Sequence, residues 1–126
     1  MRILISGLIC LLIISCKKSS SGSGGDIVGR WKLQQSLADP GNGLGKWEPV
    51  VPSTIVVFSS GGKFSGGNYF FSGFNRYSVE NDSVMVFGST VTNSSIKVRY
   101  TLSSYSLDIY PPCIEACGFK LAYTGK

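Results

Sequence analysis

The chain has 126 residues, 43% of them hydrophobic, and a formal net charge of +5 at pH 7. This length supports one domain with a real core and is too short for two. The lysines and arginines are scattered without a block, which argues against a nucleic-acid surface. Histidine is absent, so the usual general base and the commonest metal ligand are missing.

The chain begins with the anatomy of an export signal. A basic start, Met1-Arg2, precedes an apolar run over residues 3–14, which is too short to span a bilayer and has the length of a signal-peptide core. The run ends in Ser15 and Cys16, and this ending resembles the lipobox of bacterial lipoproteins. The resemblance implies that Cys16 receives a lipid and becomes the first residue of the mature chain. An ordinary secretory peptide with an incidental cysteine is the alternative.

The segment after the predicted lipidation site is a tether. Residues 16–26 are rich in serine and glycine, a composition that does not bury enough apolar surface to fold. Lys17 follows the cysteine, and resemblance to the sorting signals of Gram-negative lipoproteins implies the outer membrane, on either its periplasmic side or its surface. We therefore expect a signal peptide over residues 1–15, a lipid-anchored tether over residues 16–26 and one folded domain over residues 27–126.

The folded domain opens with a predicted strand and a predicted loop. Residues 29–34 alternate apolar and polar side chains, with Trp31 on the apolar face, as in a half-buried strand. Residues 39–43 contain the proline, glycine and asparagine that end it. Residues 44–52, which include Trp47 and two prolines, are predicted to form a loop, and loops of this length are often functional.

The rest of the domain is predicted to consist of short strands joined by turns. Residues 69–74 carry four aromatic side chains, which either enter the core or form an exposed recognition patch. Strand patterns cover residues 53–58, 63–65, 76–80, 84–87, 96–102, 105–110 and 118–124. With the first strand this makes about eight. We predict an all-β fold, an antiparallel meander closed into a small barrel rather than a sandwich, because closure removes exposed edges.

Several segments together resemble the short lipocalin-like domains of bacterial lipoproteins. They are Gly29-Arg30-Trp31, residues 54–58 with the following 61–64, the hairpin over residues 77–86, and residues 111–118. The resemblance covers residues 27–123 and implies that Trp31 plugs one end of the barrel. Residues 81–83 lack the Thr-Asp-Tyr turn of true lipocalins, and no helix-sized segment precedes the end. A smaller barrel with a smaller cavity, or none, is therefore implied.

Cys113 and Cys117 lie four positions apart in a chain predicted to be exported. An oxidising compartment favours a disulfide between them, and the chain must then turn sharply. The alternatives are a redox pair and half of a metal site. A redox pair usually has two residues between its cysteines, and a zinc site needs two more ligands, so we expect a structural disulfide and no bound metal or cofactor.

The sequence does not indicate catalysis. It has no nucleophile elbow, no histidine to activate a serine, and no recognisable pair of acidic residues for acid/base chemistry. We therefore expect no catalytic residues and predict that the protein is not an enzyme.

Two kinds of binding remain, besides the predicted membrane anchor. A barrel interior would take a small apolar ligand, as the lipocalin resemblance implies. Candidate lining residues are Tyr69, Phe70, Phe71, Phe74 and Met85, although core packing is the simpler role for each of them. The alternative is a protein-binding module or inhibitor in the cell envelope that presents Trp47 and the aromatic segment. The packing of the barrel distinguishes these two hypotheses. A closed interior with Trp47 exposed outside favours a protein partner, and an open apolar cavity favours a small ligand.

Overall fold

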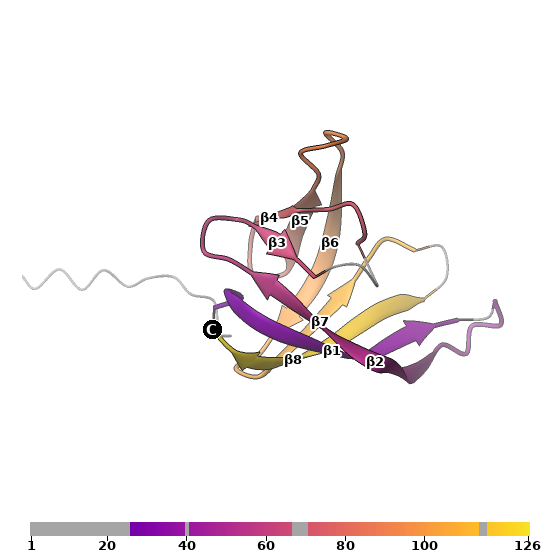
Figure 1. Ribbon diagram of the computed structural model, residues 1–126. Coiled ribbons are helices and arrows are strands. Elements are labelled where there is room, and N and C mark those ends of the chain that lie inside the picture. Colours follow the sequence, from indigo (N-terminus) through magenta and orange to yellow (C-terminus); the bar gives the residue numbers. More distant parts are fainter. Residues whose placement is uncertain (1–25, 40, 67–70, 114–115) are drawn as a thin grey trace, which may run out of the picture.

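The computed structural model describes residues 26–39, 41–66, 71–113 and 116–126 (Figure 1). The predicted signal peptide, Cys16 and the tether up to residue 25 lie outside the described residues, as do Tyr69 and Phe70. Within the described ranges the chain forms eight antiparallel strands and no helix. The all-β prediction is therefore confirmed.

The eight strands follow one another as a meander. Their bounds are β1 (Gly29–Ala38), β2 (Lys46–Phe58), β3 (Phe64–Ser65), β4 (Arg76–Val79), β5 (Val84–Gly88), β6 (Ser95–Leu102), β7 (Ser106–Tyr110) and β8 (Cys117–Gly125). The order in the sheet is β3-β2-β1-β8-β7-β6-β5-β4, so the first and last strands pair with each other. Between β3 and β4, the Phe64 amide donates to the Asn75 carbonyl at 3.0 Å and the Tyr77 amide to the Gly62 carbonyl at 3.0 Å. The sheet is thus a nearly closed barrel, as predicted.

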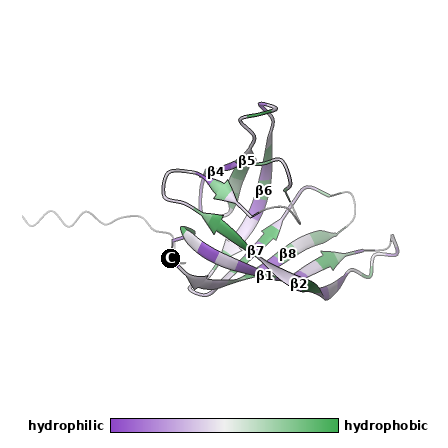
Figure 2. Cartoon of the chain, in the orientation of Figure 1, coloured by the Kyte–Doolittle hydropathy of each residue, from purple (hydrophilic) through white to green (hydrophobic). Residues whose placement is uncertain are grey.

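The core follows from the two-residue period of the strands. In β1, Trp31 and Leu33 are buried while Arg30 and Lys32 are exposed, because successive side chains point to opposite faces of a sheet. Figure 2 shows the polar residues of β1 as purple, hydrophilic bands separated by paler ones. The inward-facing Leu33 pairs with Leu121 of β8, and Leu121 pairs in turn with Leu107 of β7. The buried hydrophobic residues are Ile27, Trp31, Leu33, Val50, Val56, Phe58, Phe64, Met85, Phe87, Val98, Tyr100, Leu107, Ile109 and Leu121.

The predicted loop over residues 44–52 is wrong from Lys46 onward. Residues 46–49 pair with residues 35–38 of β1, so this segment belongs to β2. Prolines suggested a loop because they do not donate to a ladder, but proline is tolerated at a sheet edge. Here β2 is such an edge, since β3 pairs only with Val57 and Phe58.

A bulge divides β2 into two paired segments. The register moves from Gln35 opposite Pro49 to Leu33 opposite Thr54, so four β2 residues face one β1 residue. Within this bulge Val50 is buried, whereas Val51 is 84% exposed. The bulge therefore points these two consecutive side chains in different directions, as bulges at the rims of barrels do.

The barrel has two ends that differ in what they carry. Asp26 and the C-terminus lie at one end, where Arg30 pairs with Gly125 (Figure 1). The hairpin between β1 and β2 and the start of β8 lie at the opposite end, where Ala38 pairs with both Lys46 and Cys117. We call this second end the distal end, because it lies away from the point where the N-terminal segment joins the barrel.

Candidate functional site

The candidate lining residues that the structure describes pack into the barrel core. Met85 is fully buried. The ring of Phe71 stacks on that of Phe87 at 4.4 Å between centroids, and it meets Phe119 edge-on at 5.9 Å and Phe74 at 6.3 Å. Phe71 and Phe74, which were predicted as ligand contacts, are half-buried against the core. The structure thus places the described part of the aromatic segment in packing contacts.

Trp31 is buried near the end of the barrel where the chain enters. Its side chain is 1% exposed, and its indole Nε1–H donates to the carbonyl of Ile27 at 2.8 Å. The ring meets Tyr123 of β8 edge-on at 5.2 Å between centroids. This hydrogen bond gives a buried indole the partner it needs. The role of plug stays a prediction, and the position near the barrel end is compatible with it.

Trp47 lies on the outer face of the barrel. It pairs with Leu37, which in turn pairs with Gly118. Gly118 precedes Phe119 on β8, and because Phe119 points inward, this row of paired residues points outward. The glycine makes room for the ring: a Cβ atom at position 118 would lie 3.1 Å from Cη2 of Trp47 and 3.1 Å from Cδ1 of Tyr110. The two rings meet edge-on at 6.5 Å between centroids. A glycine covered by neighbouring aromatic rings thus anchors an aromatic pair outside the core.

A cation covers one side of this aromatic pair. The Lys120 ammonium lies 4.3 Å from the centroid of the Trp47 ring, within the range of a cation–π interaction. Lys120 is on β8, two positions from Gly118, so it shares the outer face. Opposite it on β7 is Asp108. The charge of Lys120 therefore faces both an aromatic ring and a carboxylate.

An open pocket of about 380 Å³ adjoins Tyr110 on the side away from Trp47. It is lined by Ser83 in the β4–β5 turn, Arg99, Tyr100 and Thr101 of β6, and Tyr110 of β7. Arg99 stands directly opposite Tyr110 in the register. Tyr100 points inward, where its hydroxyl donates to the Asn81 carbonyl at 2.7 Å.

The surroundings of Tyr110 raise the pKa of its phenol. Burial raises its pKa, and so do the charge of Asp108 and a hydrogen bond with that carboxylate, while the charge of Arg99 lowers it. The phenol therefore keeps its proton to a higher pH than a free tyrosine does. Within the described ranges no carboxylate lies at salt-bridge distance from Arg99, whereas Lys97 on the same strand contacts Glu80 at 2.9 Å.

We name this surface the outer-face site. It consists of Leu37, Trp47, Ser83, Arg99, Thr101, Tyr110, Gly118 and Lys120. The sequence singled out Trp47 alone among these residues. The others come from five separate stretches of chain and meet only through strand register, so no local motif marks them.

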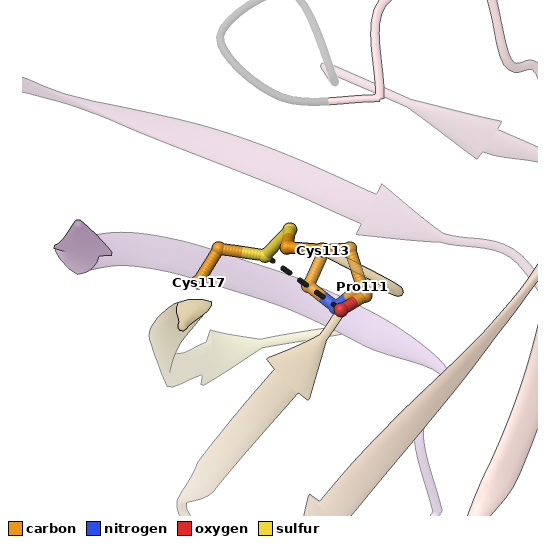
Figure 3. Close-up of a disulfide and its surroundings, with 3 residues drawn as sticks. All are labelled: Pro111, Cys113 and Cys117. Carbon is orange, nitrogen blue, oxygen red and sulfur yellow. Dashed lines mark hydrogen bonds between the residues drawn. A yellow bond between two sulfur atoms is a disulfide. The ribbon is translucent and has the colours of Figure 1, made fainter. Parts of the chain in front are cut away.

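The disulfide between Cys113 and Cys117 is confirmed (Figure 3). It links Cys113, in the segment after β7, to Cys117 at the start of β8, with the two Cα atoms 6.1 Å apart. Sγ of Cys117 lies 3.6 Å from the carbonyl oxygen of Pro111. The bridge lies at the distal end, because Cys117 pairs with Ala38. It therefore holds the strand ends that carry Tyr110 and Gly118.

The described residues contain no group of three or more metal-ligating side chains. In the same residues no helix is long and apolar enough to cross a membrane.

The chain matches no protein-family model, no curated protein and no solved structure. What it does is therefore inferred from its residues and their geometry.

Proposed function

We propose that this protein is a cell-envelope lipoprotein, anchored in the outer membrane through Cys16, whose barrel is a scaffold for binding a partner protein at the outer-face site. The signal anatomy supports the anchor: an apolar core followed by a small residue and a cysteine resembles the lipoprotein signal. The serine- and glycine-rich segment before Asp26 serves as a spacer between membrane and barrel.

The position of Trp47 carries the proposal. Tryptophan, tyrosine and arginine are the residues that most often dominate binding energy in protein interfaces. Trp47, Tyr110 and Arg99 lie on one row across the outer face, joined by pairing of β1 with β2, of β8 with β1 and of β6 with β7. A tryptophan held half-buried on the outside by a glycine is available to a partner without disturbing the core.

The placement of the site relative to the anchor supports the same reading. The lipid-anchored segment joins the barrel beside the C-terminus, whereas Trp47, Gly118 and the disulfide lie toward the distal end (Figure 1). An anchored barrel therefore presents this surface away from its point of attachment. The interior offers less support for a binding role, because Met85 is fully buried and Phe71 stacks on Phe87. The small-ligand hypothesis stays a prediction.

Site-specific photocrosslinking in living cells tests the proposal. The photoreactive amino acid p-benzoylphenylalanine replaces Trp47 in one variant and Tyr105 in a control, because Tyr105 is a 76% exposed aromatic residue in the β6–β7 turn at the other end. We expect a crosslinked product of one defined mass at position 47 that is absent at position 105. The yield should fall when Tyr110→Ala is added. Equal crosslinking at both positions, or none at position 47, would contradict the proposal.

The anchor has its own test. Cys16→Ser should abolish incorporation of a labelled fatty acid, because it removes the sulfur that carries the lipid. Unchanged labelling would refute lipidation at this residue.

A further inference from the structure

The pocket beside Tyr110 combines one unpaired cation with hydroxyl groups. Arg99 has no carboxylate at salt-bridge distance within the described part of the chain. Thr101 lines the same pocket and brings a hydroxyl, and the phenol of Tyr110 forms the wall toward Trp47. Ser83 also lines the pocket, but its hydroxyl already donates to Oδ1 of Asn81 at 3.1 Å. A cation with hydroxyl donors around it is the donor set that an anionic group requires.

Lys120 lies over the Trp47 ring, so Arg99 is the cation of this face that lines the pocket. Asp108 lies on the same face, opposite Thr101 of β6 on one side and Lys120 of β8 on the other. Lys97, the other cation of β6, already contacts Glu80. A guanidinium group offers a planar fork that fits a carboxylate through two parallel hydrogen bonds.

We propose that this pocket receives the carboxylate of an aspartate or glutamate side chain in a segment of the partner protein. This inference rests on the proposed function, since it names the chemistry recognised by the same outer-face site. Tyr110 separates the pocket from Trp47, so the recognised segment also carries an apolar side chain that packs on the two rings.

The spacing of the strands predicts the spacing of that motif. Arg99 on β6 and Gly118 on β8, over which the Trp47 ring lies, are separated by β7. Two strand spacings amount to about 10 Å, a length that about three residues of extended peptide span. The recognised segment therefore has an acidic residue two to four positions from an apolar one.

Selection from a phage-displayed library of linear dodecapeptides tests this chemistry without assuming a sequence. The bait is the chain from Asp26 to Lys126, which contains all eight strands and every residue of the buried core named above. We expect the selected peptides to be enriched in aspartate or glutamate at the predicted spacing from an apolar residue. Their binding should shift the NMR signals of the Trp47 indole and of the amides of residues 99 and 110.

Charge-removing variants then separate recognition of the acid from binding to the surface. Arg99→Gln should weaken the selected peptides about 10- to 100-fold, as expected for lost hydrogen bonds to a charged group. Arg99→Lys should restore part of the affinity, because it keeps the charge and loses the fork. The matched control is Arg76→Gln, an exposed arginine on β4 with β5 between it and β6, and it should change the affinity less than 2-fold.

The outcomes distinguish failure of this inference from failure of the proposed function. Peptides that shift the Trp47 indole but lack acidic residues and tolerate Arg99→Gln would overturn the carboxylate inference and leave the partner-binding function standing. Peptides that leave Trp47 and Tyr110 unshifted, or no selected peptide at all, would contradict both. If alginate, an acidic polysaccharide, shifts the signals of residues 99 and 110 and no peptide does, the carboxylate comes from a sugar and the peptide proposal is wrong.

Discussion

Replacement of Trp31 measures how much of the barrel depends on one buried side chain. The indole is 1% exposed, it meets Tyr123 edge-on at 5.2 Å, and its Nε1–H donates to the Ile27 carbonyl at 2.8 Å. Trp31→Ala removes the ring and the hydrogen bond together, so the free energy of unfolding should fall by about 3–5 kcal/mol. A loss of that size is a large fraction of the stability of a domain this small.

A second substitution at the same position separates packing from hydrogen bonding. Trp31→Phe keeps an aromatic ring beside Tyr123 and removes the donor, which leaves the Ile27 carbonyl buried without this partner. That change should cost about 1–3 kcal/mol, less than the alanine variant. Both losses would be measured by urea unfolding of the chain from Asp26 to Lys126, with far-UV circular dichroism as the signal. Val91→Ala, at a position 86% exposed in the β5–β6 turn, is the control and should stay within about 0.5 kcal/mol.

Two results would refute this account of Trp31. An unchanged urea midpoint for Trp31→Ala would show that the buried ring does not organise the core, and the role of barrel plug would fall with it. Equal losses for the alanine and phenylalanine variants would show that the hydrogen bond, and not the packing of the ring, dominates the contribution of this residue.

Three further perturbations probe the disulfide, the outer face and the tyrosines. Reduction of the disulfide should lower the free energy of unfolding by about 2 kcal/mol on the chain-entropy model, measured by urea unfolding with and without dithiothreitol; equal midpoints would contradict it. Gly118→Ala places a Cβ 3.1 Å from both Trp47 and Tyr110, so the rings must shift and the tryptophan emission should change. Gly61→Ala, with nothing within 4 Å, should leave the emission unchanged. Burial raises the pKa of Tyr77, Tyr100 and Tyr110. At high pH the folded state therefore keeps protons that the unfolded state releases. The contribution of these phenols to the free energy of unfolding is complete below about pH 10 and is lost as the pH rises further. Thermal melts between pH 8 and pH 11 measure this, and a midpoint that rises over this interval would contradict it.

The strands that bury one face were predictable from the sequence. Residues 96–102 alternate apolar and polar side chains, and β6 spans Ser95–Leu102. The alternation of Leu121 with its neighbours likewise marked β8, which spans Cys117–Gly125. These patterns succeed because one face of each strand must be buried, and burial imposes a period of two on the side chains.

The outer-face site was not predictable, because it depends on register. A turn confined to the two serines after Leu102 would place Arg99 opposite Asp108. In the structure Leu102 pairs with Leu107, and Arg99 therefore pairs with Tyr110. Sequence patterns locate a turn only approximately, and a small shift in the turn changes every cross-strand neighbour. The edge character of β2, which makes Pro49 acceptable in a strand, likewise depends on how β3 pairs.

The pairing of β1 with β8 determines when the barrel can form. This ladder joins the first strand to the last, and the Thr124 hydroxyl donates to the Arg30 carbonyl across 94 positions of sequence. Contacts this distant along the chain make folding slow, and β1 cannot complete its pairing until β8 is free to join the sheet. If the chain is exported as its signal predicts, it crosses the membrane with Trp31 and the rest of its core still exposed. The lipid anchor would then be attached to a chain that has yet to fold, and truncation of only the last strand would leave no native barrel at all.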